Sequence, residues 1–331
     1  MATVLPGSEP GHTRLGGGRC RSSIFATIQS TDLPPGLTIG ALDHVELPQV
    51  SAWAANEGWN PGLCDLDVAW ALEPEAFLAL RLHGEFIGVG TIFVHPPDYG
   101  FMGLFIVDPA HRGHGLGTKL WTYRRDLLME RVGHGGVIGM DGVFAMVPFY
   151  ERGGFELAYR DLRMEGTARG LVDPDVVDLH VGRADAREAN TDDLVSVDLA
   201  RMVACDRSTF PVDRTGFLGL WLTRQGVHTV GIVEDSNIVA FATARPCQVG
   251  YKLGPVVADN PGLARRVVGT LLDRIDGHQV QWDIPEPNQA ALSIASDHGL
   301  HESFGCARMY LGGVPDIDVD RLFGVTSFEF G

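Results

Sequence analysis

Short apolar runs and longer stretches with helical spacing alternate along residues 37–168, a pattern that indicates a mixed α/β unit. Apolar runs of strand length that are bounded by turn-forming residues predict β-strands. These runs cover residues 37–40, 76–82, 86–94, 99–107, 137–143 and 157–166. Helical spacing appears over residues 43–56 and from Leu116 through Trp121. Hairpin turns make the first strands antiparallel, and the run at 157–166 is expected to finish the unit as its last strand.

The connection between the strand at 99–107 and the following helix is rich in glycine. Asp108-Pro109 breaks the strand, and Gly113, Gly115 and Gly117 follow at alternate positions before the helical pattern begins. Glycines leave room where a phosphate approaches the backbone, and the unpaired amides of the next helix's first turn point at it. The order of strand, glycine loop and helix therefore predicts a site that fits a pyrophosphate.

Two other kinds of phosphate loop fit these residues poorly. A Walker loop needs a lysine before its Ser or Thr, and Gly117-Thr118 lacks it. A dinucleotide-binding loop needs an acidic residue about 20 positions later, at the end of a second parallel strand. Here the region after Trp121 still has helical spacing. A crossover helix is expected to place strand 137–143 parallel to strand 99–107.

The run Arg112-Gly113-His114-Gly115-Leu116-Gly117, after an apolar strand and Asp-Pro, resembles the acyl-CoA pyrophosphate loop of the GNAT superfamily of N-acyltransferases. Tyr150, four residues before Gly154-Phe155, matches a tyrosine on the last helix of the GNAT catalytic core. Taken alone, Tyr150 is equally well explained as a packed aromatic before a helix C-cap at Gly153-Gly154. Pro148 favours a short helix there that starts late.

The resemblance implies an N-acetyltransferase that moves the acetyl group of acetyl-CoA to the primary amine of a small molecule by direct attack. Tyr150 is then the general acid for the leaving thiolate, and Asp141 is the best-placed carboxylate to accept the proton of the amine. No metal is implied. The residues implied in acetyl-CoA binding are Phe105, Ile106, Val107, Arg112, Gly113, His114, Gly115, Leu116, Gly117 and Thr118.

The segment 57–65 is rich in turn-forming residues yet contains a tryptophan, which is typical of a binding loop. In GNAT proteins this region covers the acceptor site, so the resemblance assigns Trp59, Asn60 and Asp65 to acceptor binding. The alternative is a buried hydrophobic plug. A non-catalytic acyl-CoA sensor, or a transferase with a hydroxyl acceptor or another acyl donor, also remains open.

An internal repeat predicts two GNAT-like domains in tandem. Gly154-Phe155 stands nine residues before Arg163-Met164, and Gly299-Leu300 stands nine residues before Arg308-Met309. In the second copy Tyr150 becomes Ala295, and Arg265 and Val267 fall where the loop glycines should be. We therefore expect a flexible tail at 1–36, a catalytic domain at 37–168, a linker, and a degenerate domain at 176–331.

Composition limits the kinds of molecule that this protein is expected to bind. The net charge of -16 argues against nucleic acid and favours a cationic small molecule. The sequence has no apolar run as long as a membrane span. Five widely spaced cysteines without a CxxC motif support neither a disulfide framework nor zinc. We expect a cytoplasmic monomer or homodimer.

Overall fold

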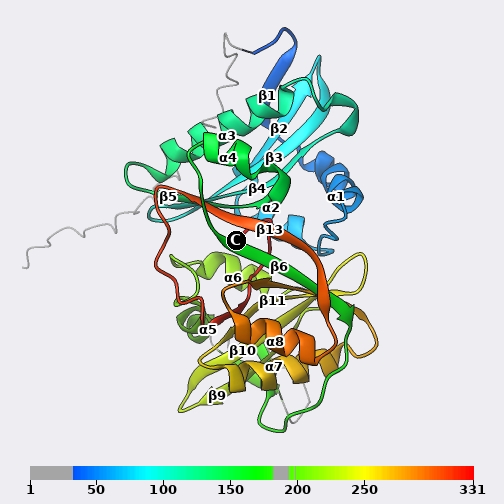
Figure 1. Ribbon diagram of the computed structural model, residues 1–331, viewed down its shortest axis with the longest axis vertical. Helices are drawn as coiled ribbons and strands as arrows, with labels where there is room; N and C mark the ends of the chain where they lie inside the picture. Colours follow the sequence, from blue (N-terminus) through cyan, green and yellow to red (C-terminus); the bar gives the residue numbers. More distant parts are fainter. Residues whose placement is uncertain (1–32, 182–193, 198) are drawn as a thin grey trace, which may run out of the picture.

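The structure, a computed structural model, describes residues 33–181, 194–197 and 199–331. The predicted tail at 1–36 lies almost entirely outside the described residues. Within them, one mixed sheet of 14 strands runs through both halves of the chain, and helices pack on it (Figure 1). The predicted α/β fold with a mixed, mostly antiparallel sheet flanked by helices is confirmed.

The first half contains all six predicted strands and both predicted helices. Its strands are β1 (Leu37–Ala41), β2 (Phe77–Leu82), β3 (Glu85–His95), β4 (Tyr99–Val107), β5 (Val137–Val143) and β6 (Glu156–Thr167). Its helices are α1 (Leu47–Asn56), α2 (Asp65–Leu72), α3 (Leu116–Val132) and α4 (Val147–Arg152). Helix α4 is short and has Pro148 in its first turn, as expected.

The second half repeats this order of elements. Its strands are β7 (Val177–Val181), β8 (Leu194–Val197), β9 (His228–Glu234), β10 (Asn237–Pro246), β11 (Tyr251–Ala258), β12 (Gln279–Pro285), β13 (His301–Leu311) and β14 (Leu322–Gly324). Its helices are α5 (Leu199–Asp206), α6 (Thr215–Trp221), α7 (Pro261–Arg274) and α8 (Gln289–Asp297). Helix α7 packs on β9, β10 and β11 as α3 packs on β3, β4 and β5.

The two halves exchange their last long strands. Strand β13 of the second half lies between β5 and β6, and β6 of the first half pairs with β12 (Figure 1). The expectation that residues 157–166 finish the first unit is therefore wrong. Two cross-strand ion pairs lie at these new edges, Arg163 opposite Asp283 and Arg308 opposite Asp141. Opposite charges facing each other across strands stabilise one register.

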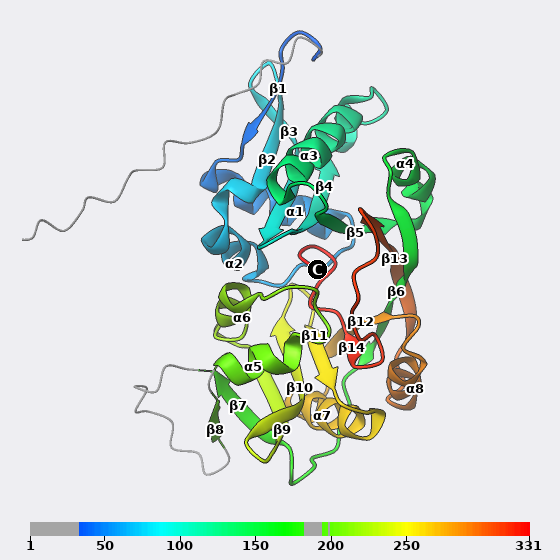
Figure 2. The ribbon, with the colours of Figure 1, turned by 90° about the vertical axis from the view of Figure 1, so that its left-hand side faces the viewer.

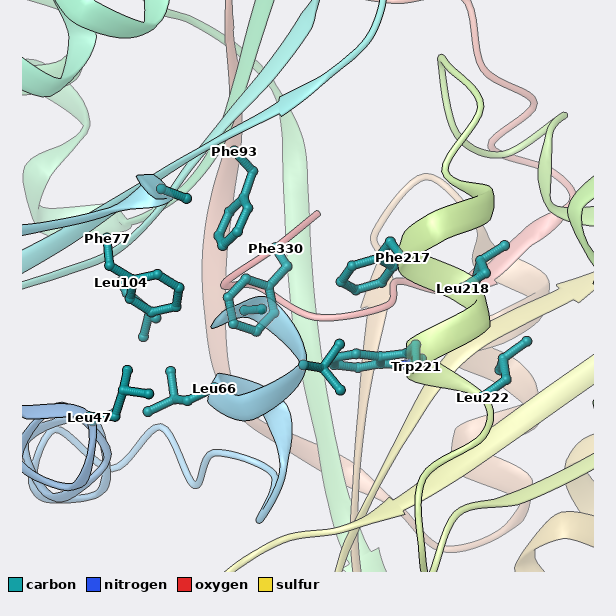
Figure 3. Close-up of a cluster of buried hydrophobic side chains, with 14 of the residues drawn as sticks. Leu47, Leu66, Phe77, Phe93, Leu104, Phe217, Leu218, Trp221, Leu222 and Phe330 are labelled. Carbon is teal, nitrogen blue, oxygen red and sulfur yellow. The ribbon is translucent and has the colours of Figure 1, made fainter. Parts of the chain in front are cut away.

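A hydrophobic cluster joins the halves away from the sheet. Phe330 lies between Phe93 of β3 and the α6 side chains Phe217 and Trp221 (Figure 3). Residues 325–331 thus run through the centre of the molecule, between the two halves (Figure 2). The second half therefore contributes to the same central region as β4 and β5.

His95 at the end of β3 makes this interface sensitive to acid. Its ring packs against Tyr99 and Phe210, and its Nε2 has no hydrogen-bond partner. Burial, helped by the charge of Arg214, lowers the pKa of His95 to about 3. A lowered pKa in the folded state stabilises the fold above pH 6.5, and this stability is lost as the pH falls toward 3.

We predict that His95→Gln reduces the acid sensitivity of folding. Between pH 7 and pH 5 the wild-type protein should lose roughly 2 kcal/mol of unfolding free energy through this histidine alone, and the variant should not. Urea unfolding at both pH values measures the difference. His44→Gln, at an exposed histidine, is the control. An equal loss in the wild type and in His95→Gln would contradict the prediction.

Candidate active site

The glycine loop between β4 and α3 has the backbone of an anion cradle. Gly113 and Gly115 have φ values of 82° and 76°, which side chains with a Cβ adopt only with strain. Gly115 is the N-cap of α3 and provides no side-chain cap, so the first-turn amides remain available. A Cβ at Gly117 would lie 3.2 Å from Val107 Cγ2 and 3.3 Å from Phe105 Cζ. These features fit the phosphates of an acyl-CoA.

The other loop residues take several positions. His114 and Thr118 are exposed, and Leu116 packs against the core. Arg112 turns back, donates from Nε to the Val107 carbonyl at 2.7 Å, and pairs with Glu57. Arg112 thereby ties the loop to the start of segment 57–65.

We predict that Gly115→Val weakens acetyl-CoA binding at least tenfold, because a β-branched residue at a positive φ must shift the loop. Isothermal titration with acetyl-CoA measures the change. Gly299→Val is a matched control, since Gly299 has the same φ of 76° in open space but lies in the second half. Equal affinities of the two variants would contradict a role of the loop in binding.

Strands β4 and β5 separate next to this loop. They pair in parallel from Tyr99 opposite Val137 to Met102 opposite Met140, and their pairing ends there. Leu104 has a φ of 45°, at an irregularity in the β3–β4 register. Arg124 of α3 donates to the carbonyls of Thr91 and Gly103, both at 2.6 Å, and so braces the bulge. The backbone of Phe105, Ile106 and Val107 thus has no pairing with β5.

A cavity that is partly open to solvent lies at this separation and is bounded by both halves. From the first half its walls include Trp59, Leu104, Phe105, Trp121, Arg124, Asp141, Tyr150 and Arg163. From the second half they include Phe304, Cys306, Phe328 and Glu329.

Tyr150 of α4 lines this cavity with its ring packed on Trp121, at a centroid distance of 6.1 Å. Gly142 of β5 gives the ring room, since a Cβ there would collide with Tyr150. Among the described residues its hydroxyl has no hydrogen-bond partner. Burial raises the pKa of Tyr150 to about 12 although Arg124 opposes this, so the hydroxyl is a neutral donor at neutral pH.

Asp141 also lines the cavity, but its carboxylate is already paired with an arginine. Both of its carboxylate oxygens accept hydrogen bonds from Arg308 of β13, each at 2.7 Å. Arg308 also lies 3.4 Å from Asp161. Burial raises the pKa of Asp141 although Arg308 opposes this, but Arg308 already occupies both oxygens. The predicted role of Asp141 as the proton acceptor therefore receives no support from this geometry.

The three predicted acceptor residues separate in the structure. Trp59 lines the cavity, and its carbonyl accepts a hydrogen bond from Lys252 Nζ at 2.8 Å. Asn60 instead joins the halves through Val249 and Gln281.

Asp65 does not reach the cavity. It is buried between Arg245 and Arg224, at 3.1 Å from each. Burial alone raises the pKa of Asp65, but these two arginines bring it below its usual value. Asp65 is therefore a structural ion-pair partner rather than an acceptor ligand, a correction that only its partners in the second half reveal.

The sequence interpretation missed the walls that the second half provides. Phe304 and Cys306 lie on the exchanged strand β13, and Phe328 and Glu329 lie on segment 325–331. The repeated Arg-Met pair marks the two exchanged strands, because Arg163 lies on β6 and Arg308 on β13. The repeat alone does not show that these strands exchange places.

The second half lacks the corresponding anion site. The side chain of Asn260 caps α7 by accepting a hydrogen bond from the amide of Leu263 at 3.1 Å. Ala295, buried in α8, occupies the place of the tyrosine. Within the described residues, no group of three or more His, Cys, Asp or Glu side chains is arranged to hold a metal ion. No described helix is long and apolar enough to cross a membrane.

Comparisons with known proteins agree with this arrangement. Residues 45–155 match the model of the acetyltransferase (GNAT) family, and residues 202–324 match that of an acetyltransferase (GNAT) domain. A holothin acyltransferase from a Pseudoalteromonas strain is 23% identical over 283 residues, which cover 85% of this chain and 90% of that protein.

Two solved structures share the fold. A putative acetyltransferase from Pyrococcus horikoshii matches with a TM-score of 0.74 and 21% identity, over 93% of this chain and 100% of that one. A tandem GNAT protein from the clavulanic acid biosynthesis pathway matches with a TM-score of 0.55 and 13% identity, over 85% and 100%. With one match in each half and a cavity bounded by both, the chain belongs to the GNAT superfamily of acyltransferases and carries two GNAT domains in tandem.

Proposed function

We propose that this protein transfers the acetyl group of acetyl-CoA to the primary amine of a small molecule. The observation that carries the proposal is Tyr150, which lines the cavity and whose neutral hydroxyl has no hydrogen-bond partner among the described residues. A protein that only binds acyl-CoA has no need of such a donor. A proton donor beside the sulfur is what a leaving thiolate requires.

The two halves of the chain have different roles in the proposed reaction. The loop at 112–118 holds the phosphates, and the β4 backbone at 105–107, which is not paired with β5, receives the thioester arm and stabilises the oxyanion. Tyr150 then donates its proton to the sulfur as the C–S bond breaks. The second half closes the cavity through Phe304 and Phe328, whose rings form an apolar wall for the body of the acceptor. Because the reaction depends on intracellular acyl-CoA, we also propose a cytoplasmic location.

Two measurements on the full chain test the proposal. Acetyl-CoA at a hundred times its dissociation constant should stabilise the fold by about 2.7 kcal/mol in thermal unfolding. Release of the CoA thiol should then depend on a primary amine, in a panel that also includes alcohols and longer acyl-CoA donors. Stabilisation without turnover would instead indicate an acyl-CoA sensor, and turnover with alcohols alone would indicate a hydroxyl acceptor.

A further inference from the structure

Residues 325–331 are fixed against the site by their own hydrogen bonds. Ser327 Oγ accepts hydrogen bonds from the amides of Glu329 and Phe330 at 3.2 and 3.1 Å. Arg214 Nη1 donates to Thr326 Oγ1 at 2.7 Å. Gly103 of β4 has no side chain where the Glu329 carbonyl approaches it, and a Cβ there would collide with that oxygen. The segment is therefore held directly beside the separation of β4 and β5.

Glu329 lines the cavity, and its carboxylate has no hydrogen-bond partner among the described residues. The residue is 7% exposed, and its Oε2 is buried without a hydrogen bond. Within the described residues, neither oxygen has a hydrogen-bond partner or a cation within 4 Å. A buried carboxylate normally accepts hydrogen bonds, because losing its hydration without replacement is costly. Its acceptor capacity is therefore available to a molecule in the cavity.

The cationic side chains around Glu329 make their hydrogen bonds to other groups. Arg163 of β6 pairs with Asp283 of β12, and Lys252 of β11 donates to the carbonyl of Trp59. Arg245 of β10 pairs with Asp65 through Nε, while its Nη1 and Nη2 are buried without a hydrogen-bond partner. Burial lowers the pKa of Lys252 and Arg163 lowers it further, while Glu329 opposes this. Toward the acyl site, the ionisable groups are Asp141 on β5, Cys306 on β13, Arg124 on α3 and Tyr150 on α4.

Two carboxylates thus line the cavity, and they differ in one respect. Asp141 gives both oxygens to Arg308, whereas Glu329 gives neither oxygen to a described residue. Trp59, Phe304 and Phe328 provide aromatic walls beside it. A site with one free carboxylate among aromatic rings fits an amine whose body is apolar or aromatic.

We infer that Glu329 binds the nitrogen of the acceptor and takes its proton during transfer, an inference that rests on the proposed function. The ammonium group of the bound acceptor first gives a proton to the Glu329 carboxylate, which passes it to solvent. As the now neutral nitrogen bonds to the carbonyl carbon and the C–S bond breaks, a second N–H proton moves to the Glu329 carboxylate. The Tyr150 hydroxyl gives its proton to the sulfur. The proton on Glu329 then returns through solvent to Tyr150, so that amide and CoA thiol leave and the enzyme is restored. The second domain thereby supplies the base and the first supplies the acid.

Glu329→Gln tests this inference, because it keeps the size of the side chain and removes the base. Acetyl-CoA should stabilise the variant as it does the wild type. At pH 7 kcat/KM for a primary amine should fall roughly 10²- to 10⁴-fold. Raising the pH to 9.5 should narrow the deficit at least tenfold, because more of the amine is then neutral without help. A purely structural role of Glu329 would not produce this recovery. Glu302→Gln, at an exposed glutamate on β13, is the control.

The outcomes separate this inference from the function on which it rests. If the wild type turns over amines and Glu329→Gln stays within threefold of it at pH 7, the role of Glu329 is overturned and the acetyltransferase stands. A deficit that does not change with pH would also overturn it. If the wild type binds acetyl-CoA but turns over no amine, both proposals fail. Asp141→Asn, measured in parallel, should lose less kcat/KM than Glu329→Gln. A larger loss in Asp141→Asn would indicate that Asp141, rather than Glu329, is the base.

Discussion

Tyr150→Phe is expected to lower kcat roughly 10²- to 10⁴-fold while leaving the affinity for acetyl-CoA unchanged. The substitution removes only the hydroxyl, and the ring keeps its packing on Trp121 and Phe149. The leaving thiolate then has no positioned donor, so the loss should appear in the chemical step. Release of the CoA thiol at saturating amine measures kcat, and isothermal titration with acetyl-CoA measures binding.

The pH dependence of the wild type gives a second measure of the same group. Because burial raises the pKa of Tyr150 to about 12, the hydroxyl stays protonated through pH 10, and its donor role should persist there. Activity should therefore show no alkaline decline below about pH 10. Tyr123→Phe, at a half-buried tyrosine of α3, is the control. A Tyr150→Phe variant with kcat within threefold of the wild type would exclude Tyr150 as the acid.

Arg308→Met is expected to lower the free energy of unfolding by about 3–5 kcal/mol. Arg308 is 4% exposed, and it neutralises the buried Asp141 and lies beside the buried Asp161. Its removal leaves both carboxylates in a region of low polarity, where an unpaired charge is costly. Urea unfolding of the full chain measures the loss. Arg160→Met, which breaks the exposed pair with Glu286, should lower the free energy of unfolding much less, because water and salt screen an exposed pair.

Lowering the pH should reduce the difference in free energy of unfolding between Arg308→Met and the wild type. Burial raises the pKa of Asp161 well above its usual value, and loss of the nearby guanidinium raises it further. A carboxyl whose pKa is raised in the folded state destabilises the fold above its unfolded pKa, and this penalty disappears as the pH falls. The difference between variant and wild type should therefore shrink between pH 7 and pH 4. A constant difference would mean that lost packing, rather than unpaired charge, causes the deficit.

Much of the fold could be predicted because its signals are local. The continuous apolar run of β4 and the proline and glycines after it depend only on neighbours in the chain. Gly115 was recognisable because a helix preceded by glycine leaves its amides open, whatever surrounds it. Tyr150 was found through its spacing to Gly154-Phe155, and the structure places it in the cavity.

The ion-pair partners of the predicted site residues could not be predicted from local sequence patterns. Asp141 and Asp65 have the same side chain, and the sequence assigned both of them to the active site. One lines the cavity with Arg308 across a strand boundary, and the other is enclosed by Arg224 and Arg245. Each arginine lies more than 150 positions away in the chain. No local pattern encodes such a distance.

The sequence by itself determined the elements, the anion loop and the tandem arrangement, because each of these depends on spacing along the chain. Only the tertiary structure decided that β6 and β13 exchange places and that residues 325–331 enter the cavity. Strand exchange depends on which edges find complementary side chains, and pairing of distant strands leaves no periodic trace in either one. Tyr150, the proposed acid, was predicted from a motif. The carboxylate of Glu329 is distinguished by having no hydrogen-bond partner among the described residues, a property that exists only in the folded chain.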